Sequence, residues 1–397
     1  MAFRSQLLPN GLEWRLVLAG ASLFTLGAFA RGFFETRRKG QVLPSPRSTL
    51  LPTLSTDELS KLPYPPDVLP GARDVDTPYG SIRVYEFGPE DGRKVLLVHG
   101  ISTPSIALGS VAQHLVDNGC RVLLFDLFGR GYSDTPDDLE HDNRLFTTQI
   151  LLVLASSPLS WTGANSGKFS LIGYSLGGGI ATTFASYFPH LIDTLILFAP
   201  AGLLRPEHIT PTNRLLYQQG IIPESLIQRI IRKRLRTPLS APPDPKDTKV
   251  DATNAVKAEV NVEHNSQAVL SKKYPNVTVV AAVAHQVDHH PGFVPAFISS
   301  IRHGPTRTEH DRWRVVGKQL TEHNRANQTN KKVLVVLGEH DPIIVKQEIE
   351  QDARETLEGN VEFVTFNAGH EVPVTLGEEI VKTIVEFWGR NDRGRSD

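Results

Sequence analysis

The chain has 397 residues, of which 40% are hydrophobic and 21% charged, and its formal net charge is −1. These values are ordinary for a globular protein, and they exclude the excess of positive charge that is typical of a nucleic-acid partner. A single cysteine, Cys120, excludes a disulfide within the chain.

The first predicted element is an uncharged run, LVLAGASLFTLGAFA, from Leu16 to Ala30. Three interpretations compete: a signal-anchor helix, a cleaved signal peptide and a buried helix. The run is shorter than the about 20 residues of a spanning helix, but flanking arginines and aromatic residues can reach the membrane interfaces. No clear cleavage site follows the run, and several basic residues lie within residues 31–39. We therefore expect residues 14–34 to anchor the chain in a membrane, with the downstream part in the cytosol.

The chain divides by composition into an N-terminal anchor with its basic flank and several later segments. Residues 41–75 are rich in proline, as in VLPSPRSTLLP and KLPYPPDVLPG, which favours an extended linker or a strap. A folded domain is expected from about residue 76. The predicted segments are 1–40 (anchor), 41–75 (linker), 76–202 (domain, first part), 203–328 (insertion), 329–392 (domain, second part) and 393–397 (polar tail).

From residue 76 onward, apolar runs alternate with helical patterns. Runs that are apolar on both faces are typical of strands in a parallel sheet flanked by helices. Strands are predicted at Ser81–Phe87, Lys94–Gly100, Arg121–Gly129, Phe169–Ser175, Asp193–Pro200, Lys331–Asp341 and Val361–Phe366, with helices at Ser110–Gly119 and Gly377–Arg390. The sequence therefore predicts an α/β fold whose functional residues lie at the carboxyl ends of the strands.

One strand end carries a serine among glycines, in IGYSLGGGI. A sharp turn from strand to helix at Ser175 requires small residues, and Gly173 and Gly177 stand two positions to either side. The turn would bring the hydroxyl to a helix N-terminus, where free N–H groups favour an oxyanion. A serine nucleophile needs a base and an acid, and Asp341 and His370 each follow a later predicted strand.

The motifs HGIS, DLFGRGYSD, GYSLGG, GEHDP and AGHEVP occur in the order found in the α/β-hydrolase fold superfamily. The chain resembles that superfamily from about residue 76 to residue 388, outside the insertion. The resemblance implies that Ser175 is the nucleophile, His370 the base and Asp341 the acid. It also implies an oxyanion hole formed by the backbone N–H groups of Ile101 and Leu176, and no cofactor.

Alternatives remain for several of these residues. Asp341 precedes a proline and is also suited to cap a helix, and Glu339 is a rival acid nearer the strand. His99 is expected to shape its loop, and Asp126 to position the loop that follows it. A serine nucleophile argues against epoxide hydrolase and haloalkane dehalogenase activity, for which the superfamily uses aspartate.

The insertion is predicted to be mostly helical and resembles the cap that many superfamily members carry at this point. Its helical spacing of Phe293, Phe297, Ile298 and Ile301 indicates a cap core. The basic run Arg229–Arg236 is interpreted as a solvated helix face, with acidic lipid headgroups as the alternative. Residues 238–267 are polar and proline-rich and predict a mobile loop. The histidines of HQVDHHPGF lack metal-site spacing, and no metal is expected.

These patterns together predict a membrane-anchored serine hydrolase that acts on a small hydrophobic substrate, such as a lipid or another carboxylic ester. The same residues also suit thioesters, amides, lactones and carbon–carbon bonds of diketones, including those of secondary metabolites, and an acyl acceptor other than water. An alternative of another class is a catalytically silent scaffold on the same fold. The sequence leaves the bond type and the oligomeric state open.

Overall fold

The computed structural model describes residues 18, 20–22, 41–163, 166–205, 208, 217–236 and 267–393. The chain divides into two units, Met1–Gln41 and Val42–Asp397. The predicted anchor, residues 14–34, lies almost entirely outside the described residues. Within the described ranges, no helix is both long and apolar enough to cross a bilayer.

The second unit contains a sheet that, in the described residues, has eight strands in the order β10-β9-β8-β7-β4-β5-β3-β2. Neighbouring strands pair in parallel along the series β10, β9, β8, β7, β4 and β5. At the other edge of the sheet, β3 pairs antiparallel with both β5 and β2. The predicted mostly parallel α/β fold is therefore confirmed. The strands are β2 (Ala72–Thr77), β3 (Gly80–Phe87), β4 (Arg93–Val98), β5 (Cys120–Phe125), β7 (Phe169–Tyr174), β8 (Ile192–Phe198), β9 (Val333–Gly338) and β10 (Val361–Phe366).

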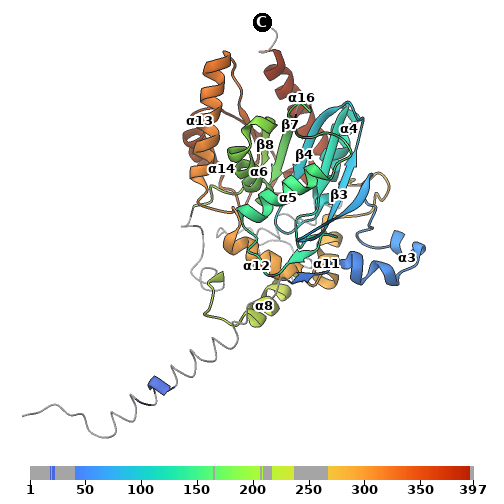
Figure 1. Cartoon of the computed structure of the whole chain (residues 1–397). Coiled ribbons are helices and arrows are strands. Elements are labelled where there is room, and N and C mark those ends of the chain that lie inside the picture. Colours follow the sequence, from blue (N-terminus) through green and yellow to red (C-terminus); the bar gives the residue numbers. More distant parts are fainter. Residues whose placement is uncertain are drawn as a thin grey trace, which may run out of the picture. The chain divides into compact units, whose positions relative to one another are not determined.

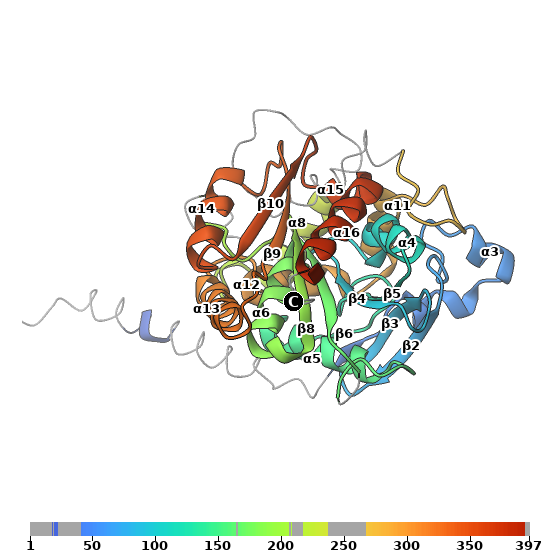
Figure 2. The ribbon, with the colours of Figure 1, turned by 90° about the horizontal axis from the view of Figure 1, so that it is seen from above.

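Helices cover both faces of this sheet, as Figure 2 shows: α4 and α16 lie on one side, and α5, α6 and α13 on the other. Strands β7 and β9 are buried along their whole length, as expected for parallel strands between two helical layers. The flanking helices are α4 (Gly109–Asp117), α5 (Asn143–Ala155), α6 (Leu176–Tyr187), α13 (His310–Asn327), α14 (Lys346–Thr356) and α16 (Gly377–Arg393). Short helices are η2 (Ser105–Leu108), η3 (Pro189–Leu191) and α15 (Val372–Thr375).

The proline-rich segment 41–75 packs onto the domain as a strap, the second of the two forms expected for it, and does not form a free linker. Strand β1 (Val42–Leu43) pairs with β6 (Thr135–Pro136), and Tyr64 is fully buried. The segment also forms α2 (Pro46–Thr49), η1 (Leu51–Thr53) and α3 (Thr56–Ser60). Proline removes backbone donors, and Ser45 supplies one that ties the segment to the domain: its N–H donates to the Asp134 carboxylate at 2.8 Å. The folded unit thus starts near residue 42 rather than 76.

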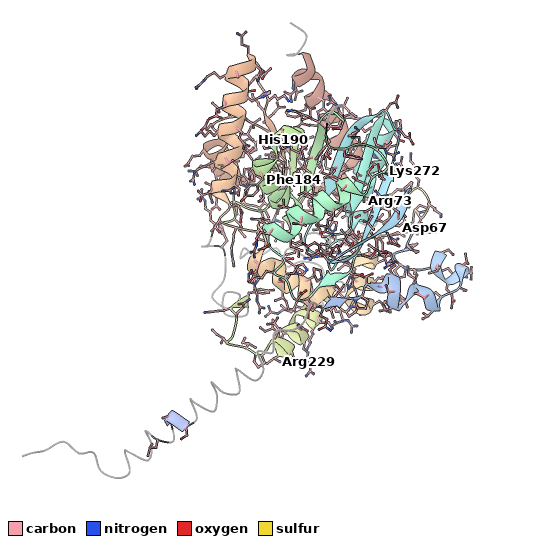
Figure 3. The ribbon with its side chains drawn as sticks, in the orientation of Figure 1. Asp67, Arg73, Phe184, His190, Arg229 and Lys272 are labelled. Atoms are coloured by element: carbon pink, nitrogen blue, oxygen red, sulfur yellow. The ribbon has the colours of Figure 1, made fainter. Side chains whose placement is uncertain are left out.

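The described part of the insertion forms a helical cap below the sheet in Figure 1, with α8 (Glu224–Arg236), α11 (Val279–His289) and α12 (Phe293–His303) in mutual contact. All four of the apolar residues predicted as cap core are buried. In α8, Ile227, Ile231 and Leu235 are buried, whereas Arg229 is exposed at the outer end of the cap (Figure 3). The predicted loop 238–267 lies outside the described residues except for its last residue.

The C-terminal limit of the insertion also differs from the predicted one at residue 328. Helix α13 packs against α6 and α14, so it belongs to the layer that covers the sheet. The cap therefore ends before His310, where α13 begins. Helical periodicity identifies an apolar face but not the element on which that face packs, which is why the sequence did not separate α13 from the cap.

Candidate active site

Ser175 lies at the sharp turn between β7 and α6. Its backbone adopts φ 53° and ψ −118°, a region that is sterically costly for a residue with a β-carbon. Three backbone hydrogen bonds hold the turn: the Ser175 N–H donates to the Phe198 carbonyl at 3.0 Å, and the Ser175 carbonyl accepts from the Gly178 and Ala201 N–H groups, each at 2.9 Å. The strained turn therefore fixes the direction of the hydroxyl.

The glycines around Ser175 are required by close backbone approach. A β-carbon at Gly173 would lie 2.3 Å from the Gly177 carbonyl oxygen, and one at Gly177 would lie 2.2 Å from the Val98 carbonyl oxygen. Both distances are shorter than any tolerable contact with backbone atoms. The glycines thus let the start of α6 pack directly against β7 and the end of β4.

The three residues predicted as nucleophile, base and acid form a continuous hydrogen-bonded chain. His370 Nε2 lies 2.9 Å from Ser175 Oγ, and His370 Nδ1 lies 2.7 Å from Asp341 Oδ2. The side chains of His370 and Asp341 are 0% and 1% exposed. In this arrangement the carboxylate holds a proton on Nδ1, so Nε2 is the nitrogen that accepts the serine proton.

Asp341 also supports its own loop. Its second carboxylate oxygen, Oδ1, accepts the backbone N–H groups of Ile343 at 2.8 Å and Ile344 at 2.9 Å. The capping role and the orienting role considered for this residue are therefore compatible, one on each oxygen. The rival acid, Glu339, is exposed, and its backbone N–H donates to the Phe366 carbonyl.

The two residues predicted to form the oxyanion hole follow neighbouring strands. Val98 of β4 pairs with Gly173 of β7, so Ile101 and Ser175 leave the sheet side by side at the same edge. Leu176 is the first residue of α6, and the N–H groups at a helix start have no partner within the helix. Both backbone segments are thus suited to donate to an oxygen held near Ser175 Oγ.

His99 braces the loop that contains Ile101. Its Nε2 accepts the Leu127 N–H at 2.9 Å, and its Nδ1 donates to the Gly100 carbonyl at 2.9 Å. Burial lowers the pKa of His99 to about 3, so the ring is neutral and keeps one donor and one acceptor at neutral pH. This geometry agrees with the structural role expected for His99.

Asp126 anchors the loop that follows β5. Its carboxylate accepts the N–H groups of Ser105 at 2.9 Å and Tyr132 at 3.0 Å. Burial raises the pKa of this carboxyl group. These contacts fix both neighbouring loops, in agreement with the positioning role expected for Asp126.

Sequence reasoning missed two buried polar residues of this region, Arg130 and Gln286. Each is fully buried, and each donates to a backbone carbonyl of the loop that contains Ile101: Arg130 to the Ile101 carbonyl, and Gln286 to the Ser102 carbonyl. The only local signal was Arg130 between two glycines in FGRGYSD, since Gln286 lies far away in the sequence, within HQVDHHPGF.

Of the three histidines of HQVDHHPGF, His285 and His290 are buried, whereas His289 is exposed. His290 Nε2 donates to the Ser133 carbonyl at 2.8 Å, while its Nδ1 accepts the Gly292 N–H at 3.1 Å. Burial lowers the pKa of His285 and of His290 to about 4 in each case. Among the described residues, no group of three or more metal-ligating side chains is placed to hold a metal ion.

Two cavities lie at the opposite, amino ends of the strands. One, of about 440 Å³, is lined by residues that include Arg93, Lys94 and Asp193. The other, of about 490 Å³, is lined in part by His190, which Figure 3 places far from Arg229 of the cap. No residue of the serine–histidine–aspartate chain lines either cavity, so neither is the substrate site.

Comparison with known proteins gives one family match and several relatives. The family model described as alpha/beta hydrolase fold matches residues 94–375. A serine hydrolase-like protein of Danio rerio is 29% identical over 131 residues, which are 33% of this chain and 38% of the relative. The sn-1-specific diacylglycerol lipase ABHD11 of Danio rerio is 28% identical over 158 residues, or 38% of this chain and 46% of the relative.

The matched stretches thus span less than half the length of these curated relatives. Among solved structures, a bacterial membrane phospholipase A superposes with a TM-score of 0.54 at 18% identity, and the match covers 96% of this chain and 99% of that one. At this identity the likeness shows the fold alone.

Proposed function

Because the chain belongs to the α/β-hydrolase fold family, we propose that it is a serine hydrolase that cleaves hydrophobic carboxylic esters. The observation that carries the proposal is the continuous contact from Asp341 through His370 to Ser175. A buried carboxylate, an imidazole and a strained serine in this order are the components of nucleophilic acyl transfer.

In the first half of the proposed reaction, Ser175 Oγ attacks the ester carbonyl carbon while His370 Nε2 takes the hydroxyl proton. The carbonyl oxygen becomes an oxyanion that accepts hydrogen bonds from the N–H groups of Ile101 and Leu176. His370 then passes the proton to the leaving alkoxide, and the acyl group stays on Ser175. In the second half, His370 takes a proton from a water molecule whose oxygen attacks the acyl carbon. The bond between that carbon and Ser175 Oγ then breaks, His370 returns the proton to Ser175 Oγ, and the carboxylic acid leaves.

The hydrophobic substrate class rests on two kinds of support. The predicted oxyanion residues, Ile101 and Leu176, are apolar and buried, and Leu176 follows Ser175 directly in the chain, which supports an apolar acyl group. One of the relatives carries the name of a diacylglycerol lipase. We therefore propose a lipid or long-chain acyl ester rather than a short polar one.

The test is a series of p-nitrophenyl esters from two to sixteen carbons, assayed with wild type and Ser175→Ala. Ser186→Ala is the matched control, because Ser186 lies on α6 and its hydroxyl donates only within that helix, to the Thr183 carbonyl. We expect turnover that rises with chain length, disappears in Ser175→Ala and persists in Ser186→Ala. Turnover confined to added thioester or diketone substrates would reject the ester proposal and retain the nucleophile.

We further propose that residues 14–34 attach the chain to a membrane. The support is the sequence alone: an uncharged run, Leu16–Ala30, with arginines at both ends. Flotation with phosphatidylcholine vesicles compares the full chain with a chain that begins at Val42, the start of the second unit. Flotation of the full chain alone supports the anchor, and equal behaviour of the two chains rejects it.

A further inference from the structure

Three successive carbonyl groups next to the predicted oxyanion hole are each held by a buried side chain. The Gly100 carbonyl accepts from His99 Nδ1 at 2.9 Å, the Ile101 carbonyl from Arg130 Nε at 3.0 Å, and the Ser102 carbonyl from Gln286 Nε2 at 3.0 Å. These carbonyls belong to residues 100–102, which we call the oxyanion loop. A buried backbone carbonyl needs a hydrogen-bond partner, which in most cases is another backbone group. Three adjacent carbonyls that all accept from side chains are therefore unusual.

The guanidinium of Arg130 links the oxyanion loop to the cap. Besides the Ile101 carbonyl, it donates through Nη1 to the Phe128 carbonyl at 2.9 Å and through Nη2 to Ser300 Oγ of α12 at 2.9 Å. Ser300 in turn donates its own proton to the Ala296 carbonyl at 2.8 Å, so its oxygen is oriented to accept from Arg130. The three contacts use the planar, fixed geometry of the arginine fork.

Gln286 makes the second connection from the cap. This residue of α11 donates from Nε2 to the Ser102 carbonyl at 3.0 Å and accepts the Gly131 N–H on Oε1 at 2.6 Å. Gln286 therefore lies between the oxyanion loop and the residue that follows Arg130. Both ends of its amide are occupied by backbone groups, which leaves it no freedom to rotate.

We propose that Arg130 and Gln286 are positioning residues for the oxyanion hole, and that the cap supplies this function through α11 and α12. The inference rests on the proposed hydrolase function. Each peptide group is planar, so holding its carbonyl also fixes the direction of the N–H in the same plane. His99 fixes the plane that contains the Ile101 N–H, and Arg130 and Gln286 fix the next two planes, which prevents the loop from rotating that N–H away from the oxyanion.

The sharpest experiment compares two neighbouring serines of α12. Ser300 accepts from Arg130, whereas Ser299 accepts the His141 N–H at 3.0 Å, so each Ser→Ala change removes one hydrogen bond between cap and core. Removal of a whole oxyanion donor costs about 100- to 1,000-fold in kcat. We expect Ser300→Ala, which only loosens the support of one donor, to lower kcat about threefold to tenfold, and Ser299→Ala to change it less than twofold.

Arg130 is tested with Arg130→Lys and Arg130→Met, which we expect to lower kcat by roughly 10- to 100-fold. The kcat values are expressed per active site, titrated with a fluorophosphonate, so that loss of folded protein is not counted as loss of catalysis. KM should change less than twofold, and binding of a trifluoromethyl ketone, which mimics the tetrahedral intermediate, should weaken by the same factor as kcat/KM.

Several outcomes would overturn the inference. A per-site kcat of Ser300→Ala and Arg130→Lys equal to that of wild type, with only the melting temperature lowered, would make both residues merely structural. An equal loss in Ser299→Ala and Ser300→Ala would show a general effect of cap docking. Absence of turnover and labelling in the wild type would instead refute the proposed function itself.

Discussion

Asp341→Asn perturbs the orienting carboxylate while leaving its loop in place. An asparagine can keep its carbonyl oxygen on the Ile343 and Ile344 N–H groups, which Asp341 Oδ1 accepts at 2.8 and 2.9 Å. Its amide nitrogen then takes the place of Oδ2, 2.7 Å from His370 Nδ1. An amide N–H requires an acceptor there, so the proton moves to Nε2, where it blocks transfer from Ser175.

The loss of one charge-assisted hydrogen bond, about 1.5–3 kcal/mol, would lower the rate by about 10- to 100-fold. The wrong tautomer is more severe, and we expect kcat to fall about 10,000-fold, equivalent to about 5.5 kcal/mol. Because the loop contacts persist, the free energy of unfolding should fall by only about 1 kcal/mol. Asp341→Ala, which also removes the loop contacts, should cost about 1–3 kcal/mol more in stability.

The assay is p-nitrophenyl ester hydrolysis at saturating substrate, with the melting temperature measured on the same samples. Glu339→Gln is the matched control, because it removes a carboxylate two residues away that is exposed. We expect its kcat to stay within twofold of wild type. More than a tenth of wild-type activity in Asp341→Asn, or a large loss in Glu339→Gln, would refute the assignment of the acid.

Three further predictions concern the fold around the site. Gly177→Ala should lower both the melting temperature and kcat by displacing α6, because its β-carbon would lie 2.2 Å from the Val98 carbonyl oxygen. Gly389→Ala, whose β-carbon would have no atom within 4 Å, should leave kcat unchanged, and equal effects of the two variants would contradict this prediction. Burial lowers the pKa of His99 and His141 to about 3 and of His285 and His290 to about 4. The stability that each contributes is complete above about pH 6.5 and is lost as the pH falls toward its folded pKa, by about 1.4 kcal/mol per pH unit for each histidine. In denaturant titrations from pH 7.5 to 4.5, the free energy of unfolding should fall with the pH, with a slope about 1.4 kcal/mol per pH unit smaller in His285→Phe than in wild type; a flat wild-type profile would count against this. A chain that begins at Val42 should keep the melting temperature of the full chain. A chain that begins at Ala72, which lacks β1 and the buried Tyr64, should unfold at a lower temperature, and equal melting temperatures would show that the strap does not stabilise the domain.

The strands and the serine–histidine–aspartate chain could be predicted because their signals are local. Strand β9 is an apolar run buried on both faces, and each member of that chain lies at, or within a few residues of, the carboxyl end of a predicted strand. Parallel strands bring their carboxyl ends to one edge, so the order along the chain was enough to expect Ser175, Asp341 and His370 together.

The parts that the sequence did not predict depend on contacts between distant residues. The strap is held by a bond from Ser45 to Asp134, and no local pattern distinguishes such a strap from a free linker. The assignment of α13 to the sheet depends on its packing against α6. Arg130 and Gln286 meet the oxyanion loop from different parts of the chain, and a buried polar residue has no periodicity of its own.

The proposed function requires the Ser175 hydroxyl to be an activated nucleophile. Its most direct test is the reaction of the folded chain with a fluorophosphonate, followed by peptide mass mapping of the adduct. We expect one phosphonyl group per chain, on Ser175. In a folded His370→Ala variant it should form at least a thousandfold more slowly, because removal of a triad base lowers the reaction rate by several orders of magnitude. A folded wild-type chain that stays unlabelled, or a label on a serine other than Ser175, would contradict the account.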